Sequence, residues 1–296
     1  MKFNNREYKL SINGINHWIK IEGYENKSMP LILIHGGPGG NHYNFERTVG
    51  RMISKERTVV YYEQRGSGRS DKPESADDYS IDLLVSDFKV LKDSLGIEKA
   101  DLLGYSFGGE LALEIAYAFP NDINKLVLSG PSLMYSNIQQ LIQIQGFMSV
   151  AEGILLERIE TILKQKKSIE EKYNEVWSIV DTKTVDRFLF EDQSVAEQNR
   201  LLWNKSGLQN TGQMMKALYK SPPHVPLLHR LKKIENETLI ITGVHDRNTG
   251  LSVSKIIDKE LNYSSLELFY NSAHFPEMEE KEKFVKLTLE FLNTKD

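Results

Sequence analysis

Residues 31–34 are apolar at every position (LILI), and this short segment constrains the fold more than any other feature of the sequence. A strand whose consecutive residues are all apolar is buried on both faces, as happens in a parallel sheet covered by helices. After it, strands and amphipathic helices are expected to alternate, over residues 58–62, 80–95, 100–104, 109–119 and 125–129. This rhythm predicts an α/β fold with a doubly wound, mostly parallel sheet.

The two ends of the chain complete this pattern. Residues 8–12 and 17–21 alternate between apolar and polar and flank the turn pair Asn13-Gly14, which predicts an antiparallel N-terminal hairpin. Near the C-terminus the expected elements are a strand, a helix, a strand and a final amphipathic helix, over residues 238–242, 252–260, 266–270 and 276–292.

Residues 131–226 interrupt the alternation, because they contain helical patterns and no clear buried strand. A chain of 296 residues is long for one domain but suits one large α/β domain with an insertion. We therefore predict a core formed by residues 1–130 and 227–296, and a helical cap formed by residues 131–226.

The segment 104–108 (GYSFG) lies between a predicted strand and a predicted helix. A Gly-x-Ser-x-Gly motif in this context is a nucleophile elbow, in which a tight turn presents the serine hydroxyl above the sheet. Small flanking residues let the backbone make that turn without clashes. Ser106 is therefore the predicted nucleophile.

A serine nucleophile needs a base with a pKa near neutral, which indicates histidine. His274 follows the last predicted strand and so should lie at the same sheet edge as Ser106. The other histidines fit less well, because His17 lies in a hairpin strand and His224 and His229 lie far from any strand end. We predict that His274 is the base.

A carboxylate should fix the imidazole tautomer, and in this fold it falls between the serine and the histidine along the chain. Asp246, which follows the strand at residues 238–242, meets this requirement. Asp258 is the nearest alternative but lies within a predicted helix. His245, beside Asp246, is interpreted as a structural neighbour.

Acyl transfer also needs hydrogen-bond donors for the developing oxyanion. The backbone N–H of Phe107 is the first candidate, at the start of the helix after Ser106. The second is Gly37, in the loop at residues 35–40 (HGGPGG), where glycines allow a close backbone approach. The alternative of a phosphate-binding loop is disfavoured, because neither a Gly-Lys-Ser/Thr ending nor a Gly-x-Gly-x-x-Gly helix start is present.

With these residues in place, the chain resembles the proline iminopeptidase group of the α/β-hydrolase superfamily. The resemblance rests on four segments, namely residues 35–39 (HGGPG), 63–70 (EQRGSGRS), 104–109 (GYSFGG) and 273–276 (AHFP). It implies an α/β-hydrolase fold with an inserted helical cap. It also implies a serine aminopeptidase or amidase that releases an N-terminal residue, often proline, from small peptides or amides.

The resemblance further implies acidic cap residues that hold the free ammonium of the substrate, since an unpaired buried ammonium is costly. The candidates are Glu191 and Asp192, with Glu197 behind them. The segment 201–212, which often carries an acid in the family, has amides and Lys205 here. A carboxylesterase, or a related hydrolase of lactones or carbon–carbon bonds, therefore stays open as the alternative. A catalytically silent ligand-binding protein is a third class, but the complete set of Ser106, Asp246, His274 and the oxyanion glycines argues against it.

Composition and charge exclude or disfavour several other classes of protein and site. A formal net charge of −4 gives no sign of a general nucleic-acid binder. The chain has no cysteine, which excludes disulfides, cysteine nucleophiles and thiolate metal sites. Residues 1–8 lack the apolar core of a signal peptide, and no apolar run is long enough to span a membrane. We expect a cytoplasmic enzyme without cofactor or metal, whose partner is a small-molecule or short-peptide substrate; the oligomeric state stays open.

Overall fold

The computed structural model describes residues 4–294. Residues 1–3, which begin the segment considered for a signal peptide, and residues 295 and 296 lie outside the described part. Eight strands form one sheet: β1 (Arg6–Ile12), β2 (Ile15–Glu22), β3 (Leu31–Ile34), β4 (Val59–Tyr62), β5 (Ala100–Tyr105), β6 (Ile123–Ser129), β7 (Glu237–Gly243) and β8 (Ser264–Phe269). Their order is β1-β2-β4-β3-β5-β6-β7-β8.

The sheet is parallel except at its N-terminal edge. The hairpin β1–β2 is antiparallel, and β2 also pairs antiparallel with β4. All the remaining neighbours are parallel. This confirms the predicted fold class, a doubly wound sheet with an antiparallel N-terminal hairpin.

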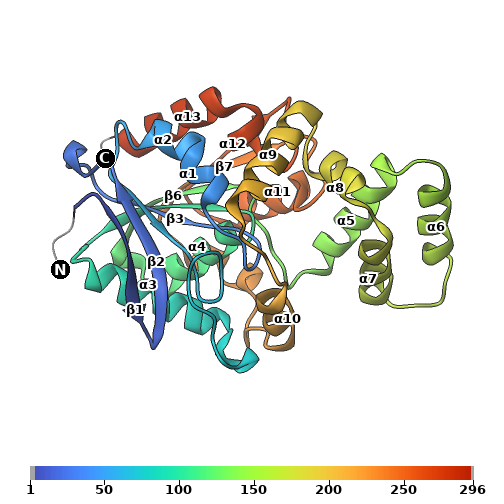
Figure 1. Ribbon diagram of the computed structural model, residues 1–296, viewed down its shortest axis with the longest axis horizontal. Coiled ribbons are helices and arrows are strands. Elements are labelled where there is room, and N and C mark those ends of the chain that lie inside the picture. The colour runs from blue at the N-terminus through green and yellow to red at the C-terminus, as the bar shows by residue number, and fades with distance from the viewer. Residues whose placement is uncertain (1–3, 295–296) are drawn as a thin grey trace.

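Helices cover both faces of the sheet (Figure 1). They are α1 (Tyr43–Arg47), α2 (Val49–Ile53), α3 (Ile81–Ser94), α4 (Phe107–Ala118), α11 (Gly250–Glu260), α12 (Pro276–Glu279) and α13 (Lys281–Asn293). Along β3, Ile32 and Ile34 pack in one core with α3, α4 and α11, whereas Leu31 and Leu33 pack in the other with α1, α2 and α13. The uninterrupted apolar run is therefore needed because alternate side chains enter two different cores.

The helix predicted at residues 276–292 is broken at Glu280, whose backbone has φ −125° and ψ 50°. The Glu280 carboxylate accepts hydrogen bonds from the hydroxyl of Ser272, at 2.7 Å, and from the backbone N–H of Asn271, at 3.1 Å. These bonds tie the break to the loop after β8. The helix pattern gave no sign of it, nor of the short helices α1 and α2.

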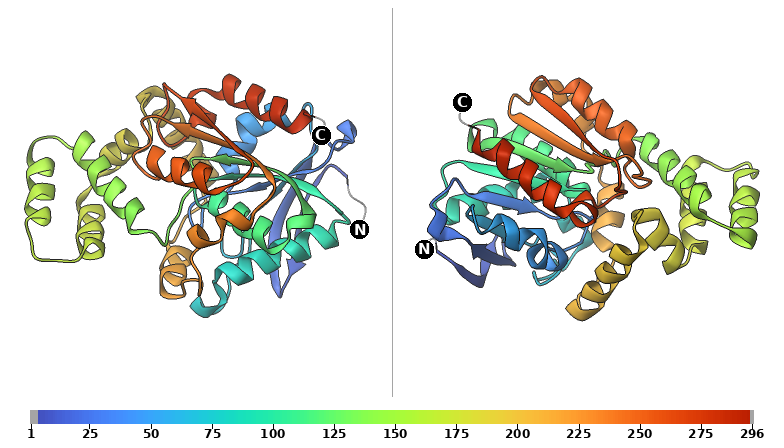
Figure 2. Two further views of the ribbon diagram at one scale, coloured as in Figure 1. Left: turned by 180° about the vertical axis from the view of Figure 1, so that it is seen from behind. Right: turned by 90° about the horizontal axis from the view of Figure 1, so that it is seen from above.

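Between β6 and β7 the described residues form helices and no strand. These helices are α5 (Asn137–Val150), α6 (Gly153–Leu163), α7 (Ile169–Ile179), α8 (Thr182–Leu189), α9 (Gln193–Ser206) and α10 (Gln213–Lys220). We call residues 131–226 the cap. Four of its helices share a buried cluster, which includes Phe147, Ile159, Val176 and Phe188. The pair α6 and α7 extends away from the sheet (Figures 1 and 2).

No described helix combines the length and the apolar character that crossing a membrane requires.

Candidate active site

Ser106 occupies the sharp turn between β5 and α4. Its φ of 55° and ψ of −126° are strained for a residue with a side chain. The turn is held by a hydrogen bond from the Ser106 N–H to the Ser129 carbonyl, at 2.8 Å. A Cβ at Gly108 would lie 2.0 Å from the carbonyl oxygen of Ile34, so only glycine fits there. The glycines of the motif thus allow the turn, and the packing of β3 and β6 against the turn holds Ser106 in its strained conformation.

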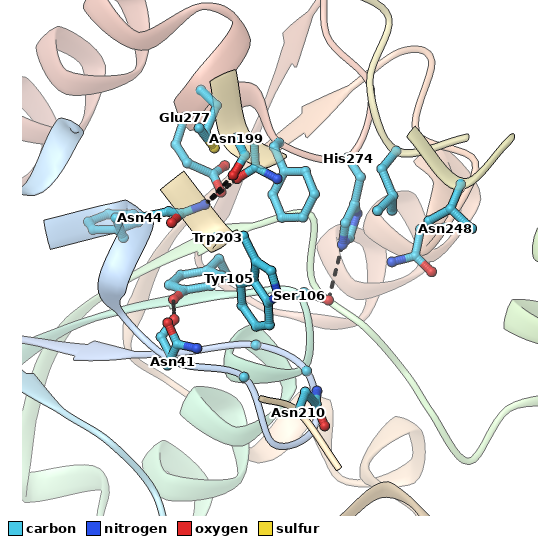
Figure 3. Close-up of a pocket in the computed structure, with 18 of the residues that line it drawn as sticks. Asn41, Asn44, Tyr105, Ser106, Asn199, Trp203, Asn210, Asn248, His274 and Glu277 are labelled. Atoms are coloured by element: carbon cyan, nitrogen blue, oxygen red, sulfur yellow. Dashed lines mark hydrogen bonds between the residues drawn. The ribbon is translucent and has the colours of Figure 1, made fainter. Parts of the chain in front are cut away.

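The structure brings the three predicted side chains together at the carboxyl ends of β5, β7 and β8. The His274 Nε2 lies 3.1 Å from the Ser106 Oγ (Figure 3). The His274 Nδ1 lies 3.1 Å from the Asp246 Oδ2. Both Asp246 and His274 are buried. This arrangement can pass a proton from a serine to an imidazole whose tautomer a carboxylate fixes.

Asp246 is held by its own loop. Its Oδ1 accepts hydrogen bonds from the backbone N–H groups of Asn248, at 2.8 Å, and Thr249, at 3.1 Å. Its Oδ2 also accepts one from the Thr249 hydroxyl, at 2.7 Å. Burial opposes ionisation of Asp246, but attraction to His274 and these hydrogen bonds outweigh it, so the pKa of Asp246 is lowered. An ionised Asp246 is therefore available beside the imidazole.

His274 shows the matching shift. Burial favours its neutral form, but the Asp246 carboxylate outweighs burial and raises the pKa of His274 above its usual value. The imidazolium that forms when the histidine accepts a proton is stabilised in this way.

The two predicted oxyanion donors flank the serine. The Phe107 N–H is at the N-terminus of α4, and Gly37 lines the cavity above Ser106. Gly37 has a φ of +125°, and a Cβ there would lie 2.5 Å from the nitrogens of Gly39 and Gly40. The loop is also fixed from the cap, where the Asn210 Nδ2 donates to the Pro38 carbonyl at 3.2 Å. The chain at Gly37 can take this path only because it has no side chain.

A cavity of about 390 Å³ lies over Ser106, between the core and the cap. Aromatic rings form much of its wall, namely those of Phe45, Tyr105, Trp177, Trp203 and Phe275. Side-chain amides from both parts of the chain add polar groups, namely those of Asn41, Asn44, Asn199, Asn210 and Asn248 (Figure 3). The Asn44 Nδ2 donates to the Asn199 side chain and so joins α1 of the core to α9 of the cap. Such a mixed wall can hold an organic molecule with a few hydrogen-bonding groups.

The predicted ammonium-binding acids lie elsewhere. Glu191 is exposed and pairs with Arg247 at 2.8 Å, and Asp192 caps the start of α9 through the Ser194 N–H at 2.8 Å. Glu197, on α9, is exposed. None of these three carboxylates lines the cavity, so the geometry gives them no role there.

Two other carboxylates line the cavity, those of Asp186 and Glu277. Asp186 of α8 is neutralised by a salt bridge to Arg200 of α9. Glu277 has no cationic side chain beside it among the described salt bridges; its Oε2 accepts a hydrogen bond from the Ser129 hydroxyl, at 2.9 Å. Burial raises the pKa of Glu277 to about 7. A cation that entered the cavity would meet this carboxylate.

Glu277 follows His274 by three residues and lies in α12, the short helix directly after the loop that brings the histidine to the sheet edge. This closeness to His274 along the chain is the only signal for Glu277 in the sequence. The wall residues of the cap, such as Trp177, Asn199 and Trp203, carry no sequence signal, because their place depends on how the cap helices pack.

The alternatives considered for base and acid lie outside the cavity. His17 is buried in β2 and its Nδ1 lies 3.0 Å from the Glu63 carbonyl. Asp258, on α11, accepts a hydrogen bond from the Ser264 hydroxyl at 2.8 Å. His224, His229 and His245 do not line the cavity either. Within residues 4–294, no group of three or more His, Asp or Glu is placed to hold a metal ion.

Comparisons with known proteins agree with the fold. A family model described as alpha/beta hydrolase fold matches residues 29–281. A proline iminopeptidase of Saccharolobus solfataricus is 27% identical over 289 residues, 95% of this chain and 90% of the relative. A 2-hydroxy-6-oxo-2,4-heptadienoate hydrolase of Pseudomonas putida is 27% identical over 274 residues, 90% of each chain. A solved structure of a proline iminopeptidase-related protein from Thermus thermophilus has a TM-score of 0.81 at 20% identity, covering 98% of this chain and 97% of that one.

Proposed function

Because the chain belongs to the alpha/beta hydrolase fold family, we propose that it is a serine hydrolase that acts through an acyl-enzyme on Ser106. The observation that carries the proposal is the pair of 3.1 Å contacts that join Ser106, His274 and Asp246 beneath a cavity. In this mechanism His274 accepts the Ser106 proton at Nε2 while the Oγ attacks the substrate carbonyl. His274 then returns the proton to the leaving group, and water releases the acyl group by the same steps.

The oxyanion of the tetrahedral intermediate would be met by the N–H groups of Phe107 and Gly37. Such donors stabilise charge that develops in the transition state and is absent from the ground state. The dipole of α4, whose N-terminus is beside Ser106, adds to this stabilisation.

Gly37→Ala should lower kcat by about a hundred- to a thousandfold, the cost of losing one oxyanion donor. The added Cβ would collide with the backbone at Gly39 and Gly40 and force the loop away from the oxyanion. The assay is hydrolysis of p-nitrophenyl butyrate. Gly14→Ala is the matched control, because Gly14 also has positive φ, +78°, but open space around it at the hairpin turn. Gly14→Ala should lower the free energy of unfolding and leave kcat unchanged. Equal kcat values for the two variants would contradict the role of the Gly37 loop in binding the oxyanion.

For the substrate we propose a small peptide or amide with a free N-terminal amine, cleaved by an aminopeptidase or amidase of the proline iminopeptidase type. Two observations support this substrate class. Relatives across 95% or more of the chain bear the name proline iminopeptidase, and Glu277 offers the cavity a carboxylate without a cationic partner. A substrate ammonium would supply that missing charge.

Glu277→Gln tests this substrate class. The ratio of kcat/KM for proline-β-naphthylamide to that for p-nitrophenyl butyrate should fall about ten- to a hundredfold, because a charge-assisted contact is lost for the amine alone. Glu282→Gln, at an exposed glutamate of α13, is the matched control and should keep the ratio. An unchanged ratio in Glu277→Gln would remove the carboxylate from amine recognition.

We also expect the ratio of kcat/KM for the same two substrates to depend on pH. Below a pH of about 7 the Glu277 carboxyl is mostly neutral, because burial raises its pKa to that value. The amine-to-ester ratio should therefore rise as the pH increases through 7, up to the point where the substrate amine itself loses its proton. Titration of His274 affects both substrates and cancels in the ratio. Glu277→Gln should make the ratio flat over the same range.

A second candidate is an esterase or a hydrolase of lactones or carbon–carbon bonds. It is favoured by the hydrolase of Pseudomonas putida, which matches 90% of the chain. The neutralised Asp186 also favours it, because among the described residues the cap then gives the cavity no free carboxylate. A panel of p-nitrophenyl esters, lactones and free-amine amino-acid amides separates the two. Good ester turnover with no release from any of the amides would rule out the aminopeptidase.

A further inference from the structure

Asn248 lies in the loop between β7 and α11, two residues after Asp246, and it is not part of the proposed catalytic machinery. Its side chain lines the cavity, on the opposite side of His274 from Glu277 (Figure 3). Its Oδ1 accepts a hydrogen bond from the Gln143 Nε2 of cap helix α5, at 2.7 Å. Within residues 4–294 no acceptor is found for its Nδ2, which points into the cavity.

Chemistry settles which end of each amide faces which way. The indole Nε1–H of Trp177, on cap helix α7, can only donate a hydrogen bond, and it meets the Oε1 of Gln143 at 2.9 Å. Gln143 must therefore turn its Nε2 toward Asn248, and Asn248 must offer its oxygen in return. The Asn248 Nδ2 is left for the cavity. A flipped amide at either position would place like groups face to face.

This chain of bonds is well supported along its length. Gln143 is only 5% exposed, so both atoms of its amide need the partners they have. The Trp177 ring makes T-shaped contacts with Phe147 and Phe188, with centroid distances of 4.8 and 5.9 Å. At the other end, the Asn248 N–H donates to Asp246 at 2.8 Å. The donor in the cavity is therefore preorganised, and its orientation is set by the cap.

We infer that Asn248 is a specificity-determining residue that donates a hydrogen bond to a carbonyl or ether oxygen of the substrate beside Ser106. Gln143 and Trp177 are positioning residues that hold its amide with the nitrogen toward the substrate. The inference rests on the proposed serine hydrolase function and names a feature of its substrate: a hydrogen-bond acceptor close to the scissile bond, on the side of His274 away from Glu277. A cavity built to donate a hydrogen bond disfavours an analogue without the acceptor.

The test uses two matched pairs of p-nitrophenyl esters. The 4-oxopentanoate and pentanoate esters differ by a ketone oxygen, and the methoxyacetate and butyrate esters differ by an ether oxygen in place of a methylene. For the wild-type protein, kcat/KM should favour the acceptor member in at least one pair. In Asn248→Leu this preference, expressed as a ratio relative to wild type, should fall about five- to tenfold. Intrinsic differences in ester reactivity are the same for both proteins, so they cancel when the preference of the variant is divided by that of the wild type.

Gln143→Glu tests the positioning role without touching the substrate. An ionised glutamate still accepts from Trp177 but cannot donate to Asn248, so in assays at alkaline pH the Asn248 amide should turn and give its Nδ2 to the new carboxylate. The preference for the acceptor ester should then be lost although Asn248 is intact. Gln145→Glu makes the same change at an exposed position of the same helix and should retain the preference. A general loss of packing would lower the rates of both esters of a pair together and leave their ratio unchanged.

A binding measurement separates this inference from the proposed function. In a Ser106→Ala background, quenching of tryptophan fluorescence reports ligands in the cavity, because Trp177 and Trp203 line it. Methyl 4-oxopentanoate should bind more tightly than methyl pentanoate, and Asn248→Leu should remove the difference. If Ser106→Ala still cleaves esters, the serine proposal fails, while the ester preference of the wild-type protein and of Asn248→Leu still decides the role of Asn248. The inference would be overturned if the wild-type protein had equal kcat/KM values for the two members of both ester pairs. It would also be overturned if Asn248→Leu kept the wild-type preference.

Discussion

Ser106→Ala should lower kcat for p-nitrophenyl butyrate by about a millionfold, the scale on which triad hydrolases lose activity without their nucleophile. The reason is geometric. The His274 Nε2 lies 3.1 Å from the Ser106 Oγ, and no other hydroxyl-bearing side chain lines the cavity among the described residues except Tyr105. The Tyr105 hydroxyl donates to the Asn41 carbonyl, at 2.8 Å, and so cannot replace the serine. What activity remains would come from the oxyanion donors and from binding alone.

The variant should fold normally. Alanine keeps the same strained backbone, and the bond from the residue 106 N–H to the Ser129 carbonyl is retained. Circular dichroism should therefore give a melting temperature close to that of the wild-type protein. Ser94→Ala, at an exposed serine of α3, is the matched control and should keep full activity. A fluorophosphonate should modify the wild-type protein at Ser106, as judged by mass spectrometry, and leave Ser106→Ala unmodified. Activity of the alanine variant within tenfold of wild type would refute the serine mechanism.

Much of the core could be predicted from local sequence, because the pattern of apolar residues within each strand indicates which of its faces are buried. At Leu31–Ile34 four consecutive apolar residues require two buried faces, and the structure has both. The elbow at Ser106 could be predicted because its glycines are needed for steric reasons that act over a few residues. His274 and Asp246 could be proposed because the carboxyl ends of parallel strands share one edge, so chain order alone limits the choice.

The cavity wall could not be predicted in the same way, because it depends on contacts between distant segments. The Asn44–Asn199 pair joins residues 155 positions apart, and the Gln143–Asn248 pair joins residues 105 apart. Neither pair leaves a periodic signal in the sequence. For this reason the acids that the family resemblance implies for the cap, Glu191 and Asp192, lie outside the cavity, whereas the cavity carboxylate without a cationic partner, Glu277, is in the core.

Asp246→Asn is the second large expected effect, and its direction follows from the bonds around this side chain. The position of Oδ1 accepts two backbone N–H groups, those of Asn248 and Thr249. Only an oxygen can accept them, so the asparagine must place its oxygen there and its nitrogen where Oδ2 is now. The Thr249 hydroxyl can then turn its proton to the Gly130 carbonyl, at 3.0 Å, and accept from the new amide. Every buried polar group keeps a partner, and the variant should fold.

The same rearrangement disables His274. The asparagine nitrogen, facing the His274 Nδ1, donates a hydrogen bond to it, so the imidazole must carry its proton on Nε2. A protonated Nε2 cannot accept the Ser106 proton, and loss of the carboxylate also removes the interaction that raises the pKa of His274. We expect kcat to fall by about ten-thousandfold near neutral pH, the loss that a wrong tautomer causes in such triads.

The matched control for Asp246→Asn is Asp258→Asn, which makes the same change on α11, where the Asp258 carboxylate accepts from the Ser264 hydroxyl. It should cost little stability and no activity. Ester hydrolysis measured across pH, together with thermal melting of both variants, separates a tautomer effect from unfolding. If Asp246→Asn lost activity only because it unfolded, its melting temperature would fall with its rate. An unchanged melting temperature with a lost rate at every pH would instead show that the defect is in the protonation of His274. The hydrogen bonds around residue 246 allow the asparagine variant to fold, but they exclude the His274 tautomer that can accept the Ser106 proton.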